Sequence, residues 1–216
     1  MKLKSFGCSF IWGSEMSAAD LLPSKHSWPA LVADHLHMPY ECLARPGSGN
    51  LQIAEQVLNH VAQEPAFFVI NWTYIDRFDY ANPANDQWHT IRPGAEHSMA
   101  DHYYRNLHSQ YRDKLTTLIN IKLCVDVLKQ AGHEFLMTYM DELTFETQWH
   151  VSPAVLSLQQ HIRPCLQQFD SMNMLEYSRG RGHVISPQAH PLESAHEDLF
   201  QHALANFAVI KEMETV

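Results

Sequence analysis

The chain has 216 residues, 45% of them hydrophobic and 18% charged, which is typical of one globular domain and excludes a disordered segment. Its net charge of −9 argues against a protein that binds nucleic acid through the phosphate backbone, because such a protein needs a basic face. No apolar run approaches the roughly 20 residues that span a bilayer, and no secretion signal follows Met1. We therefore expect a cytoplasmic protein without a membrane partner.

Cysteines and histidines give no metal-binding pattern. The four cysteines are far apart and form no CxxC pair, so we expect reduced thiols and no zinc ribbon; they stand at positions 8, 42, 124 and 165. The 15 histidines show no zinc spacing such as HExxH. Neither a metal nor another cofactor is expected.

Strands are expected where short apolar runs end at turn signals. Residues 3–6 form the first such run, and residues 40–44 the second. The clearest is the run AFFVIN at 66–71, whose unbroken apolar character is typical of a central parallel strand buried on both faces. A fourth strand is expected at 134–139.

Helices are expected between these strands. Ser27 can cap a helix over 27–35, and the proline at its start is tolerated there. A second helical pattern follows Asn50, a long helix is expected over 101–131, and a final helix is expected over 192–210.

Two stretches have no strong periodicity. Residues 77–100 are polar and contain two prolines, so we expect a long loop. Residues 141–182 are expected to form an insertion with one short helix near 156–168.

Strands that alternate with helices predict one α/β domain over 1–216, built on a parallel sheet with helices on both faces. Ligands of such sheets bind beyond the carboxyl ends of the strands. Ser9, the turn at 47–50 and the pair Trp72-Thr73 each follow an expected strand. We therefore expect these three segments to meet at one edge of the sheet.

The residues at that edge suit acyl chemistry, which needs a nucleophile, a base and hydrogen-bond donors for an oxyanion. Ser9 is the candidate nucleophile. Backbone N–H groups near Ser9, Gly47 and Gly49, together with the Asn50 amide, are candidate oxyanion donors. His190, on an expected loop before the final helix, is the candidate base.

These motifs resemble those of the SGNH (GDSL-like) hydrolase superfamily. The blocks are GCSF at 7–10, GSGN at 47–50, WT at 72–73 and HP at 190–191, in the order of the family, over residues 3 to about 205. The GCSF block is similar to a variant often found in phage and bacterial genomes. The resemblance implies a three-layer α/β/α, flavodoxin-like fold and ester or acyl hydrolysis or transfer, with Ser9 as nucleophile and His190 as base.

Two positions depart from the family pattern. The family has an aspartate three residues before its catalytic histidine, where this chain has Pro187. It also has an asparagine after the third strand, where this chain has Asn-Trp-Thr-Tyr at 71–74; Thr73 can donate a hydrogen bond instead. Asp141 and Glu193 are candidates for the missing acid.

Alternatives remain open for single residues. Taken alone, Ser9 is better explained as a turn serine that bonds its own backbone, and only the ordered blocks favour a nucleophile. Cys8 is better explained as a small buried apolar residue than as a second nucleophile.

The sequence thus predicts a serine esterase or acyltransferase for a small or carbohydrate-linked ester, acting through a Ser9–His190 dyad or an incomplete triad. The alternative is a catalytically degraded SGNH fold that binds a ligand or a protein. The sequence leaves the substrate and the oligomeric state open.

Overall fold

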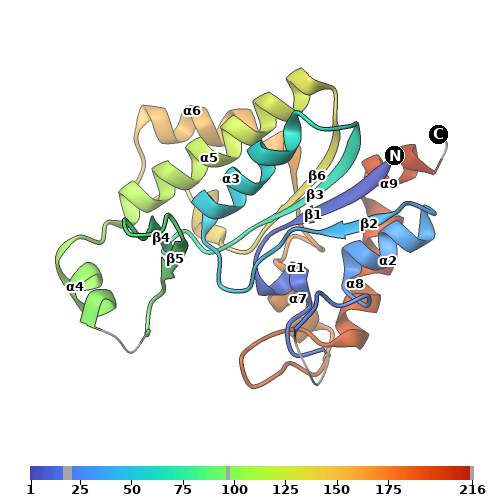
Figure 1. Cartoon of the computed structure of the whole chain (residues 1–216), viewed down its shortest axis with the longest axis horizontal. Coiled ribbons are helices and arrows are strands. Elements are labelled where there is room, and N and C mark those ends of the chain that lie inside the picture. Colours follow the sequence, from blue (N-terminus) through green and yellow to red (C-terminus); the bar gives the residue numbers. More distant parts are fainter. Residues whose placement is uncertain (17–20, 96–97, 215–216) are drawn as a thin grey trace.

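A five-stranded parallel sheet forms the centre of the protein (Figure 1). The computed structural model describes residues 1–16, 21–95 and 98–214. Within them the strands of this sheet lie in the spatial order β2 (Tyr40–Cys42), β1 (Lys2–Phe6), β3 (Ala66–Trp72), β6 (Glu134–Tyr139) and β7 (Leu166–Gln167). A separate antiparallel hairpin consists of β4 (Phe78–Ala81) and β5 (Trp88–Ile91).

Helices cover both faces of the sheet, as Figure 1 shows. One face packs against α3, α5 and α6, and the other against α1, α2, α7, α8 and α9. The helices of the described residues are α1 (Ser9–Trp12), α2 (Trp28–His35), α3 (Asn50–Val61), α4 (Ser98–Asn106), α5 (Gln110–Ala131), α6 (Pro153–Ile162), α7 (Met174–Gly180), α8 (Glu193–Asn206) and α9 (Ala208–Met213). None of them is long and apolar enough to cross a membrane.

Strand β3 joins the two halves of the core. All seven of its residues are buried. Successive side chains of a strand point to opposite faces, so Phe67 and Val69 belong to one cluster and Phe68 and Ile70 to the other. The central strand expected from the apolar run is confirmed, and so is the three-layer α/β/α architecture.

The strand order places a switch point between β1 and β3. From β1 the chain moves outward to β2, then returns past β1 to β3, as in flavodoxin-like sheets. The connections after β1 and β2 therefore diverge to opposite faces and leave a crevice at the carboxyl ends of the strands. This crevice is where the sequence motifs were expected to meet.

The loop expected over residues 77–100 is wrong in part, because it contains the β4–β5 hairpin and the start of α4. Four residue pairs form the hairpin ladder, from Phe78 opposite Ile91 to Ala81 opposite Trp88. Strands of only four residues give a period too short to recognise in the sequence. Tertiary contacts with α3 hold the hairpin in place.

Two long helices expected from the sequence are each broken. The expected helix over 101–131 ends at Asn106 and restarts at Gln110, because the Ser109 hydroxyl accepts a hydrogen bond from the Arg112 N–H and caps a new helix. The expected helix over 192–210 breaks at Phe207, which has extended backbone and is buried in the core.

The stretch 141–182 holds more structure than the one helix expected there. The expected helix near 156–168 is observed as α6, shifted towards the N-terminus. Beyond it, β7 adds a two-residue edge strand, and α7 covers the sheet on the face opposite α6. An edge strand this short has no periodicity that sequence analysis can detect.

Glycine at position 49 is required by a close approach of a side chain. The Asp79 carboxylate accepts hydrogen bonds from the Gly49 and Gln52 N–H groups at 2.9 and 3.0 Å, and so caps α3 from the hairpin. A Cβ on Gly49 would lie only 2.5 Å from this carboxylate. Asp79 and Gly49 together fix the hairpin to the start of α3.

We expect Gly49→Ala to lower the free energy of unfolding by roughly 1–3 kcal/mol, since either the carboxylate or the helix start must move. Gly180→Ala is the matched control: a Cβ there meets nothing closer than 3.8 Å, so alanine should be neutral or stabilise the protein by up to about 1 kcal/mol. Urea unfolding of both variants measures the difference, and equal stabilities would contradict the capping role of Asp79.

Candidate active site

Ser9 is the first residue of α1, directly after β1. Gly7 makes this sharp turn possible, because its φ of +153° is unfavourable for other residues and a Cβ there would lie 2.7 Å from the Ile11 side chain. The Ser9 N–H has no acceptor within α1, since the first N–H groups of a helix lack intrahelical partners. Ser9 is 7% exposed and lines a surface pocket.

Cys8 lies on the core side of the same turn. It is fully buried among apolar side chains, and its sulfur accepts a hydrogen bond from the Thr73 hydroxyl at 3.5 Å. It does not line the pocket that Ser9 reaches. The geometry agrees with packing as its role.

Glu15 follows the end of α1 by three residues and lines the same pocket as Ser9. The left-handed residue Gly13 ends α1, and the N–H groups of Gly13 and Ser14 both donate to the Ser9 carbonyl, at 3.0 and 3.1 Å. The chain therefore folds back immediately after the helix. This reversal carries the Glu15 carboxylate to His190.

A closed loop holds His190. The Ser186 N–H donates to the His190 carbonyl at 2.9 Å, and the His190 N–H donates to the Ser186 hydroxyl oxygen at 3.0 Å. The Ser186 hydroxyl in turn donates to Glu15 Oε2 at 2.5 Å. Phe10 packs against the imidazole edge to face, with ring centroids 5.6 Å apart. Backbone, hydroxyl and aromatic contacts thus fix the ring.

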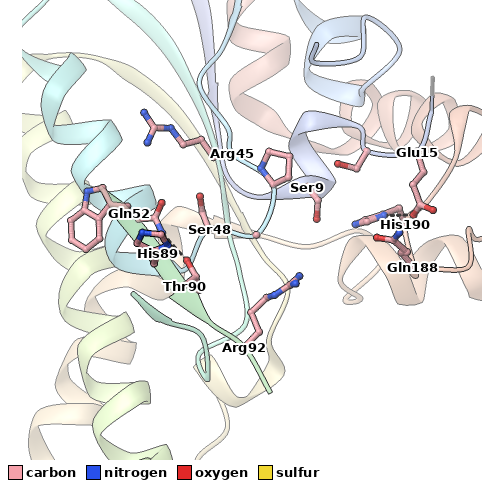
Figure 2. Close-up of a pocket in the computed structure, with 14 residues that line it drawn as sticks. Ser9, Glu15, Arg45, Ser48, Gln52, His89, Thr90, Arg92, Gln188 and His190 are labelled. Carbon is pink, nitrogen blue, oxygen red and sulfur yellow. Dashed lines mark hydrogen bonds and ion pairs between the residues drawn. The ribbon is translucent and has the colours of Figure 1, made fainter. Parts of the chain in front are cut away.

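Glu15 and His190 are joined by a hydrogen bond. The distance from His190 Nδ1 to Glu15 Oε2 is 2.5 Å, and Figure 2 shows the ring between Ser9 and Glu15. Hydrogen bonds from Ser186 and then His190 lower the pKa of the Glu15 carboxyl below its usual value of 4.5. An ionised Glu15 keeps the proton of the neutral imidazole on Nδ1, so Nε2 is left with a lone pair that can accept a proton.

The pocket has a volume of about 560 Å³ and a mostly polar wall. Its residues come from the ends of β1 and β2, the start of α3, strand β5 and the His190 loop. Besides Ser9, Glu15 and His190 they are Ser14, Arg45, Pro46, Gly47, Ser48, Gln52, Trp88, His89, Thr90, Arg92 and Gln188. The pocket therefore lies at the switch point of the sheet, closed on one side by the hairpin.

Of the sequence-predicted donors beyond Ser9, Gly49 donates its N–H to Asp79, and among Gly47, Asn50 and Thr73 only Gly47 lines this pocket. Its φ is +86°, and its N–H has no acceptor among the described residues. The Asn50 amide instead donates to the Thr73 carbonyl and to the Thr117 hydroxyl, both at 3.1 Å, and its oxygen accepts from the Thr73 N–H. Asn50 and Thr73 therefore tie α3 to the end of β3, and neither lines the pocket of Ser9.

The two sequence candidates for a third catalytic group do not contact His190. The Asp141 carboxylate accepts hydrogen bonds from the Ile75 and Leu143 N–H groups, and burial raises its pKa. Glu193 is exposed in the first turn of α8. Glu15 was missed because no motif or spacing connects it to a histidine 175 residues away; only the turn after α1 brings them together.

His196 has a structural place beside the site. Its Nδ1 accepts a hydrogen bond from the Trp28 N–H at 3.1 Å and caps α2, whereas the hydroxyl of Ser27, the expected cap, donates to the Ser24 carbonyl. Burial, and secondly the nearby charge of His190, lower the pKa of His196 to about 3. His196 is therefore neutral in the folded protein near pH 7.

We expect the buried His196 to make the protein less stable as the pH falls. Its folded pKa of about 3 lies below the ordinary value of 6.5, so the unfolded chain binds its proton first and stability declines between these two values. At pH 5 the loss is about 2 kcal/mol. Urea unfolding at pH 7 and pH 5 should give a smaller decline for His196→Asn than for the wild type; equal declines would contradict this assignment.

No group of three or more histidine, cysteine, aspartate or glutamate side chains suited to a metal ion occurs in residues 1–16, 21–95 and 98–214. At the pocket, the Glu15 carboxylate is hydrogen-bonded to the His190 imidazole.

No protein-family model matches the chain, and no curated protein matches it. Solved structures do match. TesA is 12% identical, with 99% of each chain covered and a TM-score of 0.57. A member of the lipolytic protein G-D-S-L family from Veillonella parvula is 12% identical over 96% of this chain and 98% of that one, with a TM-score of 0.51.

A catalytic mutant of Axe2, an acetylxylan esterase from Geobacillus stearothermophilus, is 11% identical over 97% of this chain and 93% of that one, with a TM-score of 0.51. Identities this low show a common fold, whereas the chemistry depends on the residues of the site. By its sheet order, its layers and these neighbours, the chain has the fold of the SGNH (GDSL-like) hydrolases.

Proposed function

We propose that this protein is a serine hydrolase of ester bonds with a Ser9–His190–Glu15 triad. The observation that carries the proposal is the Glu15–His190 hydrogen bond, in a pocket that Ser9 also lines. An ionised carboxylate on Nδ1 orients the imidazole and stabilises its charged form, which is the role of the acid in a catalytic triad. Glu15 thus supplies the carboxylate that the family provides from the position of Pro187.

In the proposed reaction the Ser9 hydroxyl attacks the ester carbonyl while His190 Nε2 takes its proton. The N–H groups of Ser9 and Gly47 stabilise the oxyanion that forms. The C–O bond to the alcohol then breaks, and His190 protonates the leaving alcohol. Water, activated by His190, hydrolyses the acyl group from Ser9; a second alcohol in place of water makes the reaction a transfer.

The pocket wall favours a small or carbohydrate-linked ester over a long acyl chain. Serine, glutamine, threonine and arginine side chains dominate the lining. Among the described lining residues Trp88 is the one large aromatic; its indole N–H donates to Glu55 at 2.6 Å, which fixes the ring as a surface for a sugar. Trp72, by contrast, is buried in the core. Neighbours of the same fold include acetyl xylan esterases.

Two assays test the proposal on the purified chain. A short-chain aryl ester such as 4-nitrophenyl acetate should be hydrolysed, and a fluorophosphonate probe should label Ser9, as located by peptide mass spectrometry. Folded protein that shows neither turnover nor labelling would instead support a ligand-binding module built on an inactive hydrolase fold.

A further inference from the structure

The pocket beside Ser9 has an excess of positive charge. Its only acid among the described residues is Glu15, whose carboxylate already accepts hydrogen bonds from His190 and Ser186. Arg45 and Arg92 also line the pocket, and neither forms an ion pair with a described residue. In a chain of net charge −9, two guanidinium groups in one pocket that no described carboxylate pairs with indicate an anionic ligand.

The backbone that carries Arg92 is held firmly. Arg92 directly follows β5, and the preceding residue, Ile91, is 3% exposed and packs with Phe78 and Tyr103. The Tyr104 hydroxyl donates to the Asp76 carbonyl at 2.7 Å and lies 3.3 Å from the Ile91 carbonyl, which ties α4 to both sides of the hairpin. The arginine therefore extends from a fixed base.

The two arginines point in different directions. In Figure 2 the Arg92 side chain extends towards the end of the pocket where Ser9 and His190 lie, whereas the Arg45 guanidinium points away from Ser9. An ester bound at Ser9 would thus present the rest of the molecule to Arg92.

We propose that the substrate ester carries a carboxylate and that Arg92 binds it. This inference rests on the proposed esterase function and names its substrate class, a small acidic ester such as an acylated sugar acid. The planar guanidinium can donate two parallel hydrogen bonds to a carboxylate, a geometry that lysine cannot reproduce. Because Arg92 is exposed, water and salt weaken this contact, so its effect is moderate.

Matched substrate pairs test the proposal. The first pair compares acetylated glucuronic acid, whose carboxylate lies on the alcohol side of the ester, with neutral acetylated glucose. The second pair compares 4-nitrophenyl hydrogen adipate, whose carboxylate lies on the acyl side, with its neutral methyl ester. We expect kcat/KM to favour the anionic member of at least one pair by about tenfold or more at low salt. Arg92→Gln should bring this ratio close to one, Arg92→Lys should leave it intermediate, and about 0.5 M NaCl should reduce it in the wild type.

Two control variants remove the same charge elsewhere. Arg45→Gln removes an arginine of the pocket that points away from Ser9, and should keep most of the preference. Arg179→Gln removes an exposed arginine of α7 that does not line the pocket, and should leave turnover and preference unchanged. An equal loss of preference in all three variants would indicate a general effect of net charge and overturn the assignment to Arg92.

Binding measurements separate this proposal from the esterase function. Glucuronate and adipate should bind to the wild type and to Ser9→Ala in calorimetric titrations, with binding weakened about tenfold in Arg92→Gln. The proposal fails if neither anion binds, or if binding and the substrate ratio are the same in Arg92→Gln and wild type. Arg92-dependent binding to a protein without Ser9-dependent turnover would instead refute only the hydrolase mechanism.

Discussion

Replacing Ser9 with alanine is expected to lower kcat/KM for 4-nitrophenyl acetate by at least about 10³-fold, because the variant lacks the hydroxyl that forms the acyl-enzyme. Labelling by a fluorophosphonate should disappear at the same time. The fold should persist, since Ser9 Oγ makes no hydrogen bond with another described residue and the side chain lines the pocket. Steady-state kinetics and circular dichroism measure both results.

Cys8→Ser and Ser14→Ala are the matched controls for Ser9→Ala. Cys8 is adjacent in sequence but buried away from the pocket, and Ser14 lines the pocket with a hydroxyl for which no catalytic role is proposed. Neither should remove fluorophosphonate labelling. Full turnover by Ser9→Ala would rule out Ser9 as nucleophile, and loss of labelling in Cys8→Ser alone would point to the thiol.

Replacing Glu15 with glutamine should lower kcat by roughly 10²–10⁴-fold, with a smaller change in KM. Glutamine preserves the shape of the side chain but removes its charge, and its NH₂ group can donate to Nδ1. The proton of His190 then moves to Nε2, so the imidazole can no longer accept the Ser9 proton. Kinetics with one neutral aryl ester measure the effect.

Glu193→Gln makes the same chemical change at an exposed position two residues beyond Pro191 and should leave kcat unchanged.

Ser186→Ala should raise the pKa of Glu15 towards 4.5, because the Ser186 hydroxyl is the largest cause of its lowered value. The folded pKa of Glu15 lies below its unfolded one, so its contribution to stability is present above the unfolded pKa and is lost as pH falls through the folded pKa. Activity of Glu15→Gln equal to that of Glu193→Gln would remove Glu15 from the triad.

Much of the fold could be predicted because it depends on local signals. The buried run of β3 and the strand of β6 were expected within one residue of their observed bounds. The alternation of strands and helices was enough to predict a parallel sheet and its ligand edge. The hairpin, the edge strand β7 and the breaks at Ser109 and Phe207 were missed, because caps and tertiary contacts of one or two residues decide them.

The candidate site also has residues that the sequence predicted correctly and residues that it did not. Ser9, Gly47 and His190 follow strands or precede a helix in an order that the sequence displays, and the structure places all three at one pocket. Asn50 and Thr73 satisfied the same criteria, yet hydrogen bonds between them turn their polar groups inward. Position after a strand predicts proximity to the crevice and does not predict the direction of a side chain.

The sequence by itself determined the layers, the sheet and the edge at which its motifs meet, since apolar periodicity and turn residues act over short distances along the chain. Only the tertiary structure decided which groups face one another there. Glu15 reaches His190 because α1 is a single turn that ends at a left-handed glycine, and Arg92 reaches the pocket because Asp79 fixes the hairpin to α3. Both depend on contacts between residues far apart in sequence, for which local propensity carries no signal.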